Sequence, residues 1–322
     1  MGEALEIAKA LVSPTMKLMD MIGGAIGTAY EPRHKRKMAD ATAYEINAIG
    51  EAMRNAADLP IVYNQDGVAI NSEDFNRLMQ RAGTRLVLQE TLKQHNIESV
   101  LDNAYDTLNY KEYCSEEPVD KDWVNTFFDS VANVSNEQMQ MIWGKILAGE
   151  IEEPGSCSIR TLDTLKKMTH KEAELFTSLF PYILKCWGDE QRSFQDYFIA
   201  YNITEKININ YPTIILLNEA GIISANSQIS VGFSIAPFGI EYIDCVNSKI
   251  EITNLSNETI NVYERAFILT EVGKTLYDVL CDKNSVSADK QYLYECGDYF
   301  SRKMSQRDSH SYKKILRINI IE

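Results

Sequence analysis

Apolar side chains recur at helical spacing through the first third of the chain. Within residues 4–30 they predict a helix that Pro14 breaks or restarts. A second helix is predicted over residues 35–59, and a long helical stretch over residues 72–108 with a break expected at Asn96. Arg77, Arg81 and Arg85 lie on one side of this stretch, where a solvated polar face or an oligomer contact are both open interpretations.

Residues 119–183 carry the clearest helix punctuation. Ser135 with Gln138 and Thr169 with Glu172 have the spacing of capping boxes, in which each side chain satisfies a free backbone N–H group. Ser158 can cap a further helix. Four short helices with short connections predict a compact bundle.

Period-two alternation replaces the helical pattern after residue 229. Ile250 and Ile252, and then Ile260 and Val262, predict strands around a turn at residues 255–258. Pro212 suits the first turn of a preceding helix, with Gly221 as its C-cap, and Thr270 can cap a helix over 271–280. This order resembles a winged-helix domain. Because residues 211–223 hold no Lys or Arg, the pattern favours protein contact over DNA binding.

These elements predict a mainly α fold with a C-terminal α+β part. The expected domains are a helical N-terminal region over 1–115, a central helical bundle over 116–187 and a winged-helix-like domain with a basic tail over 188–322.

The central segment also carries a motif that resembles a known family. The motif begins with Trp143-Gly144-Lys145-Ile146-Leu147-Ala148-Gly149-Glu150 and continues through Pro154-Gly155-Ser156 and Ser158. Trp143, Gly149, Glu150, Pro154, Gly155 and Ser158 are its structural positions, with Gly149 expected as a helix C-cap. It is similar to the bacterial family catalogued as domain of unknown function 2806, and the helical layout resembles abortive-infection proteins of the alpha type. The resemblance implies a bacterial, cytosolic, mainly helical protein of a phage-defence type, without catalytic residues to carry over.

The net charge of -14 argues against a generic nucleic-acid coat, because phosphate binding needs concentrated Lys and Arg. Two local basic clusters are the candidate binding residues. They are Arg33, His34, Lys35, Arg36 and Lys37 near the N-terminus, and Arg302, Lys303, Arg307, Lys313, Lys314 and Arg317 in the tail. The tail cluster fits either phosphate or an acidic partner, or a closing strand over 315–321 whose charges offset an acidic body.

Catalytic and cofactor motifs are missing from the sequence. It contains no phosphate loop, dinucleotide fingerprint, zinc-protease motif or nucleophile elbow, so we expect no cofactor and no metal. The six cysteines have no Cys-x-x-Cys pair, which predicts reduced thiols in the cytoplasm. No stretch reaches the ~18 apolar residues of a membrane span, and the first residues lack the basic start of a signal peptide.

The sequence therefore predicts a non-enzymatic interaction protein that binds a protein partner or itself as a homo-oligomer, in phage defence. Three alternatives stay open. The winged helix and basic tail suit nucleic-acid binding. The apolar, glycine-containing residues 4–37 suit a membrane-active effector, although Asp20 favours a buried helix. Spatial convergence of distant residues allows an unrecognised hydrolase or nuclease.

Overall fold

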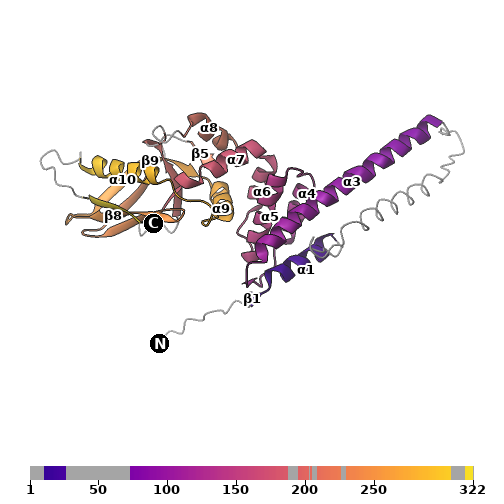
Figure 1. Cartoon of the computed structure of the whole chain (residues 1–322), viewed down its shortest axis with the longest axis horizontal. Coiled ribbons are helices and arrows are strands. Elements are labelled where there is room, and N and C mark those ends of the chain that lie inside the picture. Colours follow the sequence, from indigo (N-terminus) through magenta and orange to yellow (C-terminus); the bar gives the residue numbers. More distant parts are fainter. Residues whose placement is uncertain are drawn as a thin grey trace. The chain divides into compact units, whose positions relative to one another are not determined.

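The structure is a computed structural model, which describes residues 11–26, 73–187, 195–202, 204, 209–225, 230–305 and 316–321. The chain divides into two compact units, Met1–Gly155 (unit 1) and Ser156–Glu322 (unit 2). Figure 1 shows the described elements with their labels.

The described part of unit 1 is helical apart from one short strand pair. Its elements in chain order are β1 (Leu11–Val12), α1 (Pro14–Ile26), α3 (Glu73–Leu108), β2 (Cys114–Ser115), α4 (Lys121–Val131) and α5 (Glu137–Glu152). Strands β1 and β2 pair in antiparallel fashion. Pro14 opens α1 as expected, because a helix tolerates proline at its first position.

Aromatic rings form the core of unit 1. Phe127 of α4 lies 5.5 Å from the buried ring of Trp143 on α5, edge to face, and stacks on Trp123 at 5.1 Å. Helix α5 also crosses α3 closely at Gly144. A Cβ atom added there would lie 2.5 Å from the Cβ of Asn103, so only glycine allows this approach.

Unit 2 combines short helices with a large antiparallel sheet. Its helices are α6 (Ile159–Lys167), α7 (His170–Ser178), η2 (Phe180–Tyr182), α8 (Tyr211–Glu219), α9 (Glu271–Leu280) and α10 (Lys290–Ser305). Its strands are β3 (Leu184–Trp187), β4 (Gln195–Ala200), β5 (Ile223–Ser224), β6 (Ser230–Ile235), β7 (Ile240–Cys245), β8 (Ser248–Asn254), β9 (Ile260–Leu269) and β10 (Leu316–Ile321).

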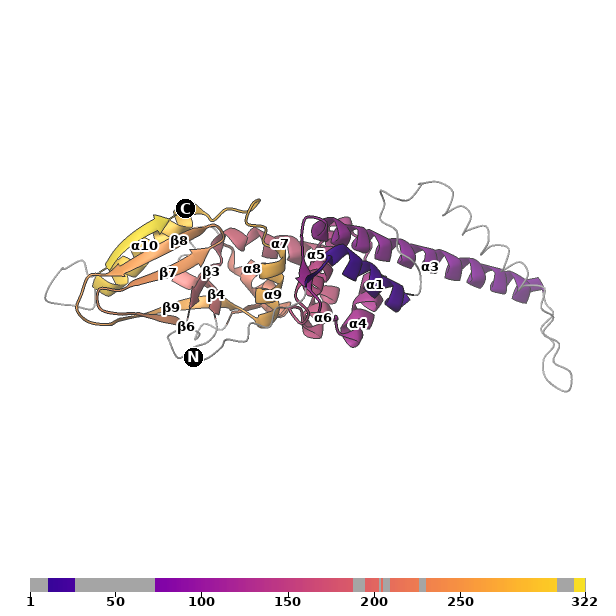
Figure 2. The same ribbon diagram turned by 90° about the horizontal axis from the view of Figure 1, so that it is seen from below.

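The eight strands follow the order β10-β8-β7-β3-β4-β9-β5, and β6 pairs with another part of β9. Figure 2 shows the sheet strands side by side. Helix α10 lies against one face and supplies Tyr292, Leu293, Cys296 and Phe300 to a core shared with strand residues such as Phe198 and Phe233. The alternating burial of β8 and β9 matches this arrangement, since only one face of each strand meets α10.

The predicted fold class is wrong, because a winged-helix domain and a separate central bundle are both missing from the described structure. Strand β8, with Ile250 and Ile252, pairs with β7 and β10, whereas β9, with Ile260 and Val262, pairs with β4, β5 and β6. The two strands therefore do not form the expected hairpin. The division between units falls inside the predicted bundle, with α4 and α5 in unit 1 and α6 and α7 in unit 2.

Several local predictions are confirmed. Ser158 caps α6, Thr169 and Glu172 form a capping box at α7, and Thr270 caps α9. Pro212 lies in the first turn of α8, and Gly221 follows that helix with a positive φ.

Three helix boundaries differ from the prediction. Asn96 does not break α3. Its side-chain amide donates to the carbonyl of Ala132, so this buried polar group has a hydrogen-bond partner inside a continuous helix. Asn136, and not Ser135, caps α5 by accepting from the N–H of Met139. Helix α5 continues past Gly149 to Glu152, so Gly149 is not its C-cap.

Candidate functional site

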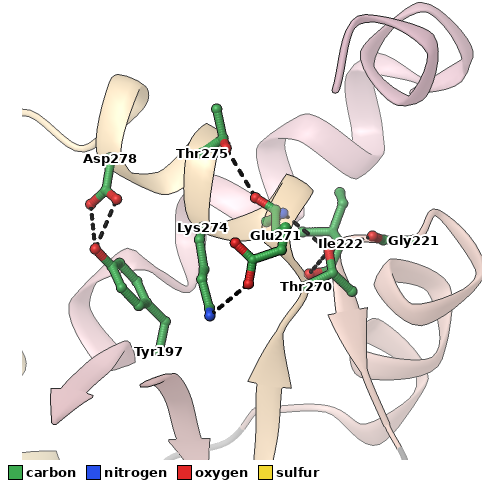
Figure 3. Close-up of polar contacts among 9 residues, drawn as sticks. Tyr197, Gly221, Ile222, Thr270, Glu271, Lys274, Thr275 and Asp278 are labelled. Carbon is green, nitrogen blue, oxygen red and sulfur yellow. Dashed lines mark hydrogen bonds and ion pairs between the residues drawn. The ribbon is translucent and has the colours of Figure 1, made fainter. Parts of the chain in front are cut away.

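A polar cluster lies where α9 meets strands β3 and β4 in unit 2. Lys185 on β3 and Tyr197 on β4 are direct cross-strand neighbours, and both reach Asp278 on α9. The Tyr197 hydroxyl donates to the two carboxylate oxygens of Asp278 at 3.0 and 2.8 Å (Figure 3). The Lys185 ammonium donates to Asp278 at 2.8 Å and to the Tyr197 hydroxyl at 3.3 Å.

Two aromatic rings complete the surroundings of Lys185. Its Nζ lies 4.3 Å from the ring centre of Tyr197 and 4.7 Å from that of Tyr277. A cation over two ring faces and beside a carboxylate is stabilised without full exposure to water. The side chain of Lys185 is accordingly only 14% exposed. Its charge therefore joins α9 to the sheet.

The tyrosines of this cluster stay protonated. Burial raises the pKa of Tyr197 strongly, and its hydrogen bond to Asp278 raises that pKa further. Burial likewise raises the pKa of the Tyr277 hydroxyl, which lies beside the Cys281 thiol. With these raised pKa values, neither hydroxyl loses its proton near neutral pH, so neither can act as a general base there.

The neighbouring thiols are not activated either. Burial raises the pKa of Cys245 to about 12, and its Sγ donates to the carbonyl of Pro181 at 3.3 Å. Burial also raises the pKa of Cys281, against the opposing hydrogen bond from Tyr277. Because a reactive cysteine needs a lowered pKa, these thiols are typical of structural positions.

The N-terminus of α9 is fixed by backbone contacts to β5 and the turn before it. Thr270 donates its hydroxyl to the carbonyls of Gly221 and Ile222 at 2.7 and 3.1 Å (Figure 3). The same hydroxyl accepts from the N–H of Gly273 at 3.1 Å. Lys274 pairs with Glu271 within the helix at 2.8 Å. These polar groups at the start of α9 are thus bonded to one another or to the neighbouring backbone, which is the arrangement of a structural junction. Among the described residues, no group of His, Cys, Asp and Glu is placed to hold a metal ion.

The predicted basic clusters fall mostly outside the described residues. Arg33, His34, Lys35, Arg36 and Lys37 lie there, as do Arg307, Lys313 and Lys314. Arg302 on α10 pairs with Asp298 one turn earlier at 2.7 Å, and Lys303 is part of the same helix. Arg317 is exposed on β10, the terminal strand predicted for this segment.

The motif residues around Glu150 have structural positions. The buried carboxylate of Glu150 accepts from the N–H of Gly155 at 2.6 Å. Gly155 has a φ of 84°, which favours glycine, and follows Pro154 in the turn after α5. Trp143 is fully buried, so this motif builds the helix end and the turn in unit 1.

An exposed apolar surface on α3 was not expected. The half of α3 nearer Leu108 buries Ile97, Val100 and Leu101 in unit 1. In the other half, however, Leu78 is 52% exposed, and Met79 and Leu86 are each 54% exposed. Together with the half-buried Ala82, Gly83 and Val87, these residues form the α3 stripe. Figures 1 and 2 show α3 extending beyond α1, α4 and α5.

The α3 stripe lies on the same helix face as the buried residues. Met79, Leu86, Lys93 and Val100 follow one another at seven-residue intervals, so they share one face. Lys93 interrupts the apolar run and pairs with Glu90 at 2.7 Å. This charged pair lies between the buried half and the exposed half of the helix.

The opposite side of this helix half has different chemistry. Arg81, Arg85, Leu88 and Leu92 line a shallow hollow of about 630 Å³ there. Residues three and four apart share a helix face, and by this spacing Arg81 belongs to the side away from Met79 and Leu86. By the same spacing Arg81 follows Leu78 and Arg85 follows Ala82, so these two arginines lie along one edge of the α3 stripe.

These features define a two-unit α+β protein whose candidate site is an exposed helical surface. The chain belongs to the family described as Protein of unknown function (DUF2806), whose sequence profile matches residues 80–294. The family resemblance inferred from the motif around Trp143 is thereby confirmed. No curated protein and no solved structure matches the chain. None of the described helices is long and apolar enough to cross a membrane.

Proposed function

We propose that this protein is a non-enzymatic interaction protein that binds a protein partner through the α3 stripe. The observation that carries the proposal is the exposure of Leu78, Met79 and Leu86 along one face of one helix. Exposed apolar side chains are ordinary when scattered, but a contiguous group is typical of a contact surface. Burial of this group stabilises a complex by roughly 25 cal/mol per Å² of apolar surface removed from water.

The polar cluster at α9 supports a non-enzymatic role. Its carboxylate, ammonium and hydroxyl groups are bonded to one another, and its tyrosine and cysteine pKa values are raised by burial. A general base or nucleophile needs the opposite shift in these residue types. We therefore assign this cluster a structural role.

The alternatives for membrane and nucleic-acid binding receive less support from the described residues. Helix α1 buries Leu18 and Ile22 completely, and Lys17 donates to the carbonyls of Ser115 and Ile151. These contacts use the apolar face of α1 inside unit 1, so that face is not available to a lipid surface. Nucleic-acid binding loses the winged helix on which it partly rested.

We also propose a cytoplasmic location. The structure joins none of the six cysteines, all of which it describes, in a disulfide. Reduced thiols are typical of the cytoplasm. A role in phage defence stays a prediction, because it rests on the resemblance to abortive-infection proteins alone.

In-cell photo-crosslinking tests the proposed function and captures the partner in the same step. A photoreactive phenylalanine analogue is placed at Leu86, and a matched control places it at Thr84 on the other side of α3. We expect discrete protein adducts from Leu86 and far fewer from Thr84, because only the first position lies in the α3 stripe. Mass spectrometry then identifies the adducts. Equal adduct formation at both positions, or none at Leu86, contradicts the proposal.

A further inference from the structure

We draw no further inference here: the strongest candidate beyond the α3 stripe, the exposed apolar patch of Phe238, Ile240 and Leu255 at the turns before β7 and after β8, carries none because nothing in the described part of the structure shows what covers it.

Discussion

Gly144 allows helices α3 and α5 to approach closely in unit 1. A Cβ atom at this position would meet the Cβ of Asn103 at 2.5 Å and the backbone nitrogen of Ala104 at 3.0 Å. Neither atom is the end of a flexible side chain. The helices α3 and α5 would have to move apart to admit even a methyl group.

Gly144→Ala should therefore destabilise the protein by about 1–3 kcal/mol, although alanine favours helices more than glycine does. Urea denaturation followed by circular dichroism measures the change in the free energy of unfolding. Met141→Ala, at an exposed position of the same helix, serves as control and should change it by less than about 0.5 kcal/mol. An unchanged or higher stability in Gly144→Ala would show that α3 and α5 do not approach as closely as described.

The buried thiol of Cys245 makes the free energy of unfolding depend on pH in the alkaline range. Burial raises the pKa of Cys245 from 9.0 to about 12, so between these values the unfolded thiol loses its proton while the folded thiol keeps it. The unfolded state then binds fewer protons, and the free energy of unfolding falls as pH rises. Below pH 9 the contribution is fully present.

Cys245→Ala should flatten this dependence. Its free energy of unfolding should be lower than that of the wild type at neutral pH, because the substitution leaves a cavity, and should fall less steeply above pH 9. Urea denaturation of both proteins at several pH values measures the slopes. Identical slopes would mean that the Cys245 thiol ionises alike in the folded and unfolded states.

Residues that act locally could be predicted from sequence, whereas residues that act at a distance could not. Helices are capped by Ser158, Thr169 and Thr270, each of which accepts from the backbone N–H three residues later. Such short spacing can be read from the sequence. Asn96 was predicted to mark a break between two helices. The structure shows that its side-chain amide instead donates to the carbonyl of Ala132, and the sequence does not reveal a contact between residues so far apart. Glu150 was assigned to a motif, but its bond to Gly155 needed the structure.

Among the elements, strands β8 and β9 show where sequence patterns lose information. Period-two alternation correctly predicts both strands, but it does not say which strands pair. Their adjacency in the chain suggested a hairpin. Strand β8 instead pairs with the distant β10, and β9 pairs with the earlier β4. The winged helix was the consequence of that assumption.

Helix α9 is joined to the sheet by a bonded pair that can be measured. Tyr197→Phe removes the hydroxyl that donates to Asp278, and Asp278→Asn removes the charge that accepts it. A double-mutant cycle on the free energy of unfolding should give a coupling of about 1 kcal/mol. A pair of Tyr197→Phe with Glu90→Gln in the other unit serves as control and should be additive. Additivity in both cycles would remove the proposed structural role of the cluster.

Helix α3, 36 residues long, was predicted as a helical stretch with a break at Asn96, and its two halves differ in burial. The apolar spacing is alike in both halves, so the sequence alone does not distinguish them. Burial distinguishes them, since Val100 and Leu101 are covered and Met79 and Leu86 are not. The candidate contact surface thus became visible only when the limits of unit 1 were known.

For the whole molecule, in-cell photo-crosslinking from Leu86 and from Thr84, side by side in the full chain, tests the central claim most directly. The account predicts discrete protein adducts from Leu86 and far fewer from Thr84, because only Leu86 lies in the α3 stripe. Equal adduct formation at both positions, or no adduct at Leu86, would contradict it.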